Sequence, residues 1–488
     1  MEEKLLLQLS SWNPWWQNGP EGIKRYSIPD YKRELYPEIF RQYEKTDQII
    51  SIVGMRQIGK STIMRQIIRD LLSQGVPPKN IIYISFDDPL IKTNFTEEGL
   101  FDKIINIYSE AILNEDIANS KDKFYVFLDE IHQLPSWEKI LKSYYDRSYP
   151  LKFIVSGSSS IQLQKKNRES LLGRISEYTL WPFSFREYVE LKSSEAKDVQ
   201  LLDLVGLSRK MFEKFIYKLE VESNMRTLKP VYNKAILHKS KIEKYLKEYI
   251  ICGGFPRAWK EPDFISRQRF LWEGQVGKIL FEDLAQTTNI RKPKDLEQLL
   301  AYLIDFNGKE VVLTDLAVNL KLHRATLDKY ISYLKKTFLV FQVDSTKSKR
   351  MAIKRKSGNI KFYMTDIAIR NAFYKKDESV YFDSNEMGII AENLVCSLLR
   401  RWLYGPHKDE QISFFKNRSG EVDFVVKTPT TVLPIEVKWR NNVPTLKALD
   451  ELVADWKLKN SLLITKDFNL SLENGRLSIP LWFFLLSF

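Results

Sequence analysis

The chain has 488 residues, with 75 Lys and Arg against 62 Asp and Glu, so its formal net charge is +13. A single core stops growing at about 250–300 residues, so this length predicts several folding units. The basic excess favours a polyanion partner such as nucleic acid, with a solvated basic surface as the alternative. Two cysteines are too few for a disulfide framework, which fits a reducing cytoplasm. Four histidines leave little room for a histidine metal centre. We find no long apolar run and no signal-peptide pattern, so we expect no membrane span.

Residues 1–45 are expected to form an N-terminal arm with an aromatic cluster at Trp12, Trp15 and Trp16. Between residues 46 and 182, short apolar runs alternate with helical patterns. The runs predict strands at 48–53, 80–86, 124–129, 152–156 and 177–181, and the first helical pattern spans 60–73. Such alternation is typical of a parallel α/β sheet.

The segment GMRQIGKST at 54–62 satisfies the phosphate-loop pattern GxxxxGK[ST]. The buried strand before it and the apolar-striped helix after it supply the context that the pattern requires. Glycines allow a sharp turn that points backbone N–H groups at phosphates, and the helix N-terminus adds positive charge. We expect Lys60 to reach the β- and γ-phosphates and Ser61 to bind Mg²⁺. The residues predicted to contact ATP are Gly54, Gln57, Ile58, Gly59, Lys60, Ser61 and Thr62.

Asp129 and Glu130 follow the apolar run FYVFL, which places them at the carboxyl end of a buried strand. We predict that Asp129 holds Mg²⁺ and that Glu130 polarises the attacking water, with a solvated turn as the alternative. Ser156 and Ser158 end the next strand, where a hydroxyl could sense the γ-phosphate; a plain Gly/Ser turn is the alternative. Arg174 is a candidate arginine finger that requires an oligomer to act in trans, and an ordinary surface charge is its alternative.

Residues 183–268 are mostly helical and highly charged, with an interruption at CGGFP, residues 252–256. Residues 269–375 hold helices and a basic, hairpin-like stretch. Within them, 311–341 fits a helix-turn-helix whose second helix opens at Arg324. A basic wing follows, which would contact DNA phosphates, although such modules also serve only protein contacts. Its basic residues are Lys347, Lys349, Arg350, Lys354, Arg355 and Lys356.

Residues 376–488 return to α/β character, with a helix at 388–403 and strands near 422–426 and 435–439. Strand alternation places Val422, Phe424 and Val426 on one side, and directs Asp423, Glu436 and Lys438 to one face of a hairpin. Glu392 lies at the edge of the helix's apolar arc. This set resembles the PD-(D/E)xK nucleases, although Val422 replaces the motif's proline. The resemblance implies that Asp423 and Glu436 bind Mg²⁺ and that Lys438 activates water; a non-cleaving domain is the alternative.

The whole chain from about residue 30 resembles archaeal and bacterial AAA-type ATPases that carry a C-terminal domain of the DUF4143 type. The matching stretches include GMRQIGKST, FLDEIHQLPSW, IVSGSSS, GGFPRA, KFYMTDIAIRNAF, GEVDFVV and IEVKW. The resemblance implies an α/β fold: a P-loop ATPase core of the additional-strand class (46–182), a helical lid (183–268), a winged helix (269–375) and a small PD-(D/E)xK-like domain (376–488). It also implies that Pro256 packs on the nucleotide base and that Arg257 senses phosphate. We therefore expect an ATP- and Mg²⁺-dependent hydrolase that acts on DNA and can assemble as a homo-oligomer. The alternative is an ATP-operated switch whose C-terminal half binds DNA or a protein partner without cleaving.

Overall fold

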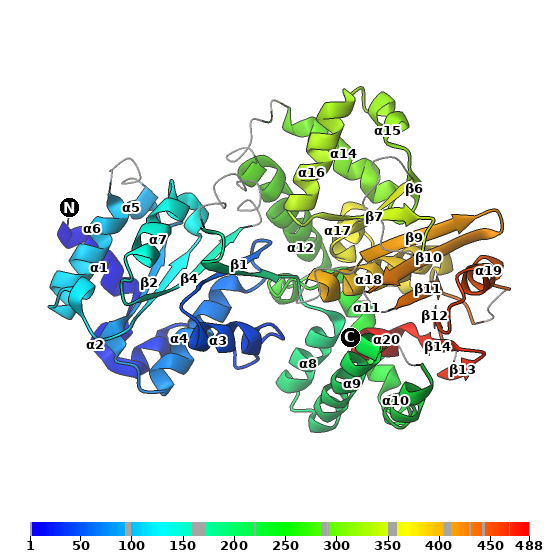
Figure 1. Cartoon of the computed structure of the whole chain (residues 1–488), viewed down its shortest axis with the longest axis horizontal. Helices are drawn as coiled ribbons and strands as arrows, with labels where there is room; N and C mark the ends of the chain where they lie inside the picture. Colours follow the sequence, from blue (N-terminus) through cyan, green and yellow to red (C-terminus); the bar gives the residue numbers. More distant parts are fainter. Residues whose placement is uncertain are drawn as a thin grey trace. The chain divides into compact units, whose positions relative to one another are not determined.

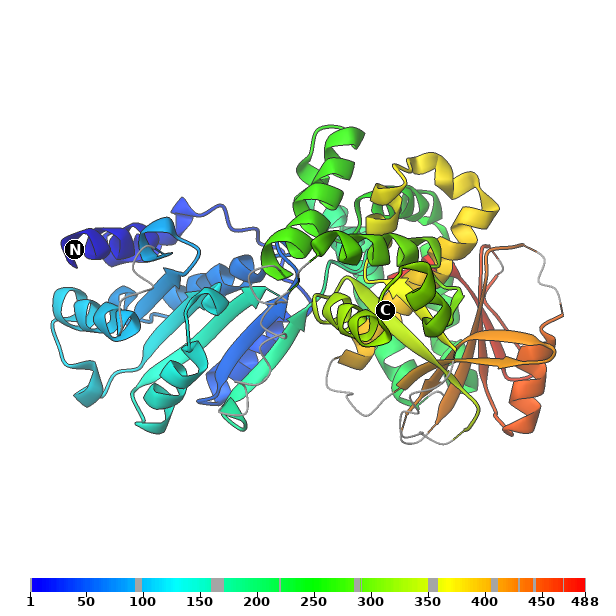
Figure 2. The ribbon, with the colours of Figure 1, turned by 90° about the horizontal axis from the view of Figure 1, so that it is seen from above.

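Apolar segments in the first 180 residues form a five-stranded parallel sheet in the computed structural model (Figure 1). The strand order is β2-β3-β4-β1-β5, so β4 separates the strand before the phosphate loop from the strand that ends at Asp129. This separation is the mark of the additional-strand class, and the prediction is confirmed. The strands lie side by side in Figure 2. Their bounds are β1 Ile49–Gly54, β2 Ile81–Ser85, β3 Phe124–Asp129, β4 Leu151–Ser158 and β5 Ile175–Leu180.

Helices flank this sheet, and the helix after the phosphate loop has the predicted bounds, 60–73. The N-terminal arm packs on the edge strand β2. Asn13 exchanges hydrogen bonds with the backbone of Tyr83, and Trp15 and Trp16 donate their indole N–H groups to the carbonyl of Ile81. These side chains cover an edge that would otherwise expose unpaired backbone groups. The helices are α1 Glu2–Trp12, α2 Trp15–Asn18, α3 Tyr36–Lys45, α4 Lys60–Ser73, α5 Pro89–Lys92, α6 Leu100–Ile107 and α7 Trp137–Asp146.

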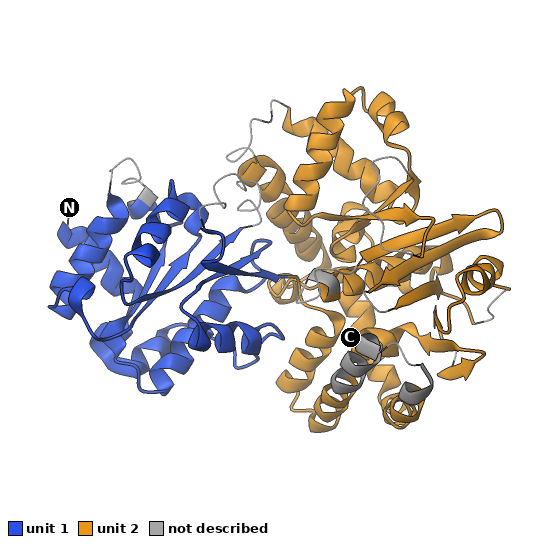
Figure 3. Ribbon diagram, in the orientation of Figure 1, with its two compact units in different colours: residues 1–180 blue, residues 181–488 orange. Residues whose placement is uncertain are grey.

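The structure describes residues 2–92, 99–158, 171–218, 221–284, 290, 292–349, 359–404, 411–428, 431–441, 445–467 and 469–487. The chain divides into two compact units, residues 1–180 and 181–488 (Figure 3). The sequence-based boundary between 182 and 183 lies next to this division. The other three boundaries, after residues 45, 268 and 375, fall inside a unit.

The second unit joins helices and a mixed sheet around one core. Its first helices, in the segment 183–268, share that core with the C-terminal sheet, and Tyr232 of α10 stacks on Trp482 of α20. The helices before residue 300 are α8 Phe185–Glu195, α9 Val199–Lys218, α10 Val221–Ile236, α11 Lys239–Cys252, α12 Phe264–Arg269 and α14 Pro293–Asp305. Those after it are α15 Leu313–Asn319, α16 Arg324–Lys336, α17 Ile367–Phe373, α18 Ser384–Tyr404, α19 Lys447–Asp455 and α20 Leu481–Ser487.

One nine-stranded sheet runs through the second unit in the order β13-β14-β12-β11-β10-β9-β7-β8-β6. Parallel pairing of β7 with β9 joins the predicted winged-helix region to the C-terminal region, so no structural break follows residue 375. The strands are β6 Glu310–Val311, β7 Val340–Thr346, β8 Ile360–Met364, β9 Gln411–Asn417, β10 Gly420–Lys427, β11 Val432–Lys438, β12 Ser461–Thr465, β13 Ser471–Glu473 and β14 Arg476–Pro480.

The two helices predicted within 311–341 are present as α15 and α16, which bury Leu316 and Leu327 on their apolar faces. Strands β6 and β7 both pair antiparallel with β8, so the predicted hairpin-like stretch is an antiparallel pair. Of the basic residues predicted in it, Lys347 and Lys349 are exposed. The others, Arg350, Lys354, Arg355 and Lys356, lie outside the described residues.

Candidate active sites

The phosphate loop begins at the carboxyl end of β1, and glycines stand where its backbone turns sharply or approaches a neighbouring strand. Gln57 and Gly59 have positive φ values of 58° and 106°, and glycine adopts such conformations with little strain. Gly54 permits a close approach, because a Cβ there would lie 2.3 Å from the carbonyl oxygen of Leu180. Ile58 is fully buried beneath the loop. The loop therefore presents its backbone to a ligand and anchors itself with an apolar side chain.

Lys60 begins α4 and is 4% exposed. Its ammonium donates to the backbone carbonyl oxygens of Gly54 and Met55, at 3.2 and 2.8 Å. The side chain thus folds over the loop, where phosphate oxygens would replace these carbonyls as acceptors. Ser61 and Thr62 follow in the first turn of the helix, both partly exposed. Their contacts with ATP and Mg²⁺ stay predictions.

Asp129 ends β3 as a buried carboxylate held by two hydroxyl groups. Tyr83, on the neighbouring strand β2, donates its O–H to Asp129 Oδ2 at 2.6 Å, and Ser156 of β4 donates to Oδ1. The backbone N–H of Glu130 in turn donates to Ser156 Oγ at 3.3 Å. Ser156 therefore orients Asp129, and the hydroxyl proton of Ser156 is used in its hydrogen bond to Asp129 Oδ1. The oxygen donors gathered here are of the kind that Mg²⁺ prefers.

Glu130 has a left-handed backbone, with φ of 51°, a conformation uncommon outside glycine. Burial raises the pKa of its carboxyl to about 7; the nearby Lys60 charge lowers this pKa and the Asp129 charge raises it. A carboxyl that titrates near neutrality is suited to accept a proton from water. The structure brings Glu130, Asp129 and Lys60 to the same carboxyl edge of the sheet, as predicted.

Arg174 lies at the opposite edge of that sheet. Its backbone carbonyl accepts a hydrogen bond from the N–H of Ile49, which is the first residue of β1. The phosphate loop lies at the other end of β1, after its last residue. Its guanidinium forms a 2.6 Å ion pair with Asp146. Arg174 therefore does not reach the phosphate loop of its own chain, and a finger role requires a second copy.

Pro256 and Arg257 belong to the second unit, so their predicted nucleotide contacts stay predictions. Gly253 and Gly254, just before them, pack against Asp366: the N–H of Gly254 donates to its carboxylate at 2.7 Å. Arg257 is exposed and lies 3.9 Å from Glu261. The glycines of this motif therefore tie α11 to the turn before α17.

The three residues predicted to converge in the C-terminal hairpin do converge. The Lys438 ammonium lies 2.5 Å from a Glu436 carboxylate oxygen and 3.9 Å from one of Asp423. Asp423 also accepts a 2.8 Å hydrogen bond from the backbone N–H of Val437. Asp423 and Glu436 are 7% and 4% exposed. Two buried carboxylates and one lysine thus form a compact site at the junction of β10 and β11.

A β-bulge in β10 shapes this site. The pairing register of β10 with β9 shifts between Val422 and Val425. As a result, Val422 and Val425 pack together in a small apolar cluster, while Phe424 and Val426 face the main core. The predicted alternation, which placed Val422 beside Phe424 and Val426, is wrong at Val422, because an extra residue turns that side chain over. Bulges often re-aim side chains beside active sites.

Glu392 of α18 approaches the same site but is held by residues that the sequence did not single out. Tyr363 donates its O–H to Glu392 at 2.5 Å, and the Lys361 ammonium lies 3.3 Å from the same oxygen. Lys361 also pairs with Glu421. Both partners come from β8, which pairs with β6 and β7. The contact of Tyr363 and Lys361 with Glu392 follows from the strand order of the sheet and has no signal in the local sequence.

Crowded carboxylates shift the titration of this site. Burial, followed by the Asp423 charge, raises the pKa of Glu392 to about 7 and that of Glu436 to about 8. Burial acts to lower the pKa of Lys438, but the charges of Asp423 and Glu436 raise it. Carboxyls that resist ionisation beside one another gain from a bound cation. Among the described residues, however, no three His, Cys, Asp or Glu side chains form a cluster that could hold a metal ion.

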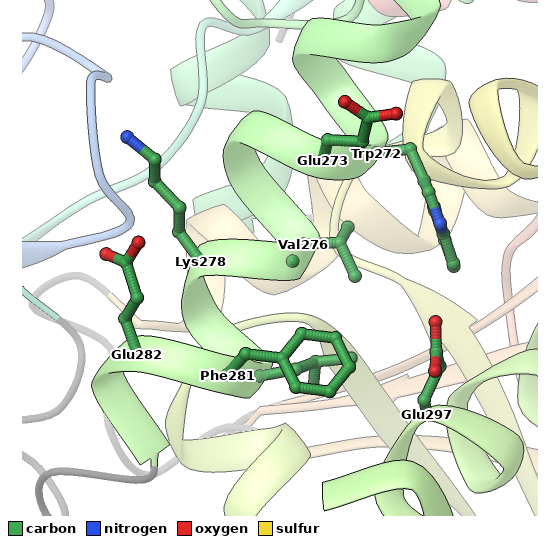
Figure 4. Close-up of a pocket in the computed structure, with 9 residues that line it drawn as sticks. Trp272, Glu273, Val276, Lys278, Phe281, Glu282 and Glu297 are labelled. Atoms are coloured by element: carbon green, nitrogen blue, oxygen red, sulfur yellow. The ribbon is translucent and has the colours of Figure 1, made fainter.

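A cavity of about 390 Å³ lies elsewhere in the second unit, between the helical turns η8 (Phe270–Gly277) and η9 (Ile279–Asp283) and helix α14 (Figure 4). Trp272, Val276 and Phe281 form much of its wall, with the Glu297 side chain opposite. None of the predicted catalytic residues lines it. Within the second unit, the site at Asp423, Glu436 and Lys438 is therefore separate from this cavity.

Strand order, loop geometry and the paired acids define an AAA-type P-loop nucleotide-binding unit. Residues 46–189 match the family model described as an AAA domain. Residues 243–379 and 387–484 match two domains of unknown function, DUF8612 and DUF4143. The chain thus carries an AAA-type P-loop ATPase domain and a C-terminal DUF4143 domain, which confirms the family resemblance for these two parts.

Similar proteins occur in archaea and bacteria. The uncharacterized protein MJ1544 of Methanocaldococcus jannaschii is 25% identical over 423 residues, covering 85% of this chain and 80% of its own. An uncharacterized protein of Haemophilus influenzae is 24% identical over 413 residues, covering 83% and 86%. The solved structure of the Walker-type ATPase paby2304 of Pyrococcus abyssi aligns with 16% identity and a TM-score of 0.37, over 70% of this chain and 96% of that one. Among the described helices, none is long and apolar enough to cross a membrane.

Proposed function

We propose that this chain binds and hydrolyses ATP at the loop 54–61 and uses the nucleotide cycle to control a DNA-processing site at Asp423, Glu436 and Lys438. The ATPase part rests on the shared sheet edge of Lys60, Asp129 and Glu130. The DNA part rests on one observation: a lysine ammonium lies within 4.0 Å of two buried carboxylates on adjacent strands. Buried acidic side chains are uncommon in proteins, and clusters of them with shifted pKa values often mark functional sites.

In the ATPase reaction, the backbone N–H groups of the loop and the Lys60 ammonium would hold the β- and γ-phosphates. Lys60 exchanges its two carbonyl acceptors for phosphate oxygens when ATP enters. Glu130 accepts a proton from the attacking water, and Ser156 keeps Asp129 oriented through its hydroxyl. Mg²⁺, when bound by Ser61 and Asp129, supplies neutralisation of charge on the phosphates.

In the C-terminal site, Asp423 and Glu436 offer oxygen ligands of the kind that Mg²⁺ and Mn²⁺ take. A cation bound there would stabilise the charge that develops on a phosphodiester. Lys438, next to both acids, would orient the attacking water. The antiparallel β6-β8-β7 arrangement beside α15 and α16 supports a winged-helix interpretation, and the exposed Lys347 and Lys349 suit phosphate contacts.

The alternative is an ATP-operated switch whose C-terminal half binds DNA or a protein partner without cutting. The 2.5 Å contact between Lys438 and Glu436 favours it, because in this arrangement the lysine occupies the place where a cation would neutralise the acid. On this reading the acids and lysines stabilise one another and do no chemistry.

Incubation of the purified chain with plasmid, forked and four-way DNA separates the two functions. The reactions contain Mg²⁺ or Mn²⁺, with and without ATP, and compare the wild type with Asp423→Ala. The nuclease proposal predicts cleavage by the wild type alone. DNA binding without cleavage, or equal cleavage by both proteins, favours the switch or a contaminating nuclease.

A further inference from the structure

His132 occupies the turn directly after Glu130 and is almost completely enclosed, with 7% of its side chain exposed. Its Nδ1 lies 3.2 Å from Glu130 Oε2. Both atoms are buried, and neither has a hydrogen-bond partner within the described residues. A buried polar atom left without a partner costs about 1–3 kcal/mol, so a small rotation that joins the two atoms is favourable.

The other ring nitrogen of His132 faces β4. Its Nε2 lies 3.4 Å from Ser158 Oγ and 3.2 Å from the side-chain nitrogen of Gln133. An amide nitrogen only donates, so Nε2 accepts and the ring proton lies on Nδ1, toward Glu130. Burial, together with the charges of Lys60 and Arg56, lowers the pKa of His132 to about 3. The ring is therefore neutral, with one donor and one acceptor pointing in different directions.

Ser158 lies beside the start of the phosphate loop and is buried. It is the last residue of β4 and pairs in register with Gly54, the first residue of the phosphate loop. Glu130 follows β3, the neighbour of β4 on its other side. His132 thus spans the distance between a hydroxyl beside the phosphate loop and the carboxylate predicted to act as base.

We propose that His132 is a positioning residue that couples Ser158 to Glu130, so that γ-phosphate contact at Ser158 sets the orientation of the general base. This inference rests on the proposed ATP hydrolysis. The single lone pair of Nε2 is shared by two donors, the Gln133 amide and the Ser158 hydroxyl. When a phosphate oxygen takes the Ser158 proton, Nε2 keeps the Gln133 amide as its donor, so the ring turns away from Ser158 and its Nδ1–H closes on Glu130. Glu130 needs such a guide because its left-handed backbone alone does not fix the carboxylate.

The test compares steady-state ATP hydrolysis and equilibrium binding of mant-ATP, a fluorescent ATP analogue. The variants are H132A, H132Q, S158A and the double variant H132A/S158A. We expect H132A to lower kcat roughly 10- to 100-fold, the range seen when a supporting partner of a catalytic group is lost, while mant-ATP affinity is unchanged. H132Q should recover most of that loss, because its amide carries a donor and an acceptor at similar spacing. The double variant should be no slower than H132A, since both changes break one chain of contacts.

Three results overturn the coupling: H132A retains the wild-type kcat, the two single losses multiply in the double variant, or H132A loses mant-ATP binding as well as turnover. The substitution H238A, at a half-buried histidine of the second unit, controls for histidine removal as such. Wild-type protein that binds mant-ATP but releases no phosphate refutes the proposed hydrolysis itself. Wild-type hydrolysis with an unaffected H132A refutes only the role of His132.

Discussion

Replacing Glu436 by Gln should stabilise the metal-free protein at mildly alkaline pH. Glu436 is 4% exposed, and burial, aided by the Asp423 charge, raises its pKa from 4.5 to about 8. Between these values the folded chain keeps a proton that the unfolded chain has released, so the free energy of unfolding falls as pH rises through this range. One pKa unit corresponds to about 1.4 kcal/mol, so ionising Glu436 in the folded chain costs at most about 4–5 kcal/mol of the free energy of unfolding. Loss of the Lys438 contact offsets part of it, leaving a gain on the order of 1–3 kcal/mol.

Chemical unfolding in EDTA, followed across this pH range, measures the effect. The difference between Glu436→Gln and wild type should grow as pH rises and level off above the pKa of Glu436. Glu473→Gln removes an exposed carboxyl from β13 and should track the wild type. If Glu436→Gln follows the wild-type curve at every pH, or loses stability toward alkaline pH, burial and charge crowding do not govern this site.

Three further outcomes follow from particular contacts. Because Glu130 must be ionised to act as a base, kcat/KM for ATP should rise with pH through about 7, and a rate that falls over this range contradicts the assignment. Arg174→Ala should lower turnover only at protein concentrations where copies associate, since Arg174 pairs with Asp146 away from its own phosphate loop; unchanged turnover at all concentrations excludes a finger. Lys361→Met should lower the Tm, because it leaves Glu392 buried without its cation, whereas an unchanged Tm means that the ion pair is structurally neutral.

Local sequence signals were enough to predict the elements around the phosphate loop. The phosphate loop, strand β3 and helix α4 have the expected bounds, because glycines, acids and an apolar stripe mark their ends within a few residues. The Asp423, Glu436 and Lys438 group was also predictable, since two short alternating segments specify a hairpin. In each case the signal lies within one or two neighbouring elements.

Contacts between distant strands were not predictable in the same way. Tyr83 reaches Asp129 only because β2 and β3 are neighbours, and Lys361 reaches Glu392 because β8 packs against α18. Strands β9, β12, β13 and β14 were not predicted, although β9 and β13 each pair with the strand that follows them. Strand β12 joins the sheet by parallel pairing with β11 and β14. The bulge that turns Val422 over depends on register with β9, which strand alternation alone does not encode.

ATP turnover by the intact chain tests the central claim most directly. Phosphate release is measured for the wild type, Lys60→Ala and Glu130→Gln, alongside mant-ATP binding. The structure predicts hydrolysis by the wild type, loss of binding and hydrolysis in Lys60→Ala, and binding without hydrolysis in Glu130→Gln. A wild type that releases no phosphate, or a Glu130→Gln variant that hydrolyses ATP at the wild-type rate, contradicts the account.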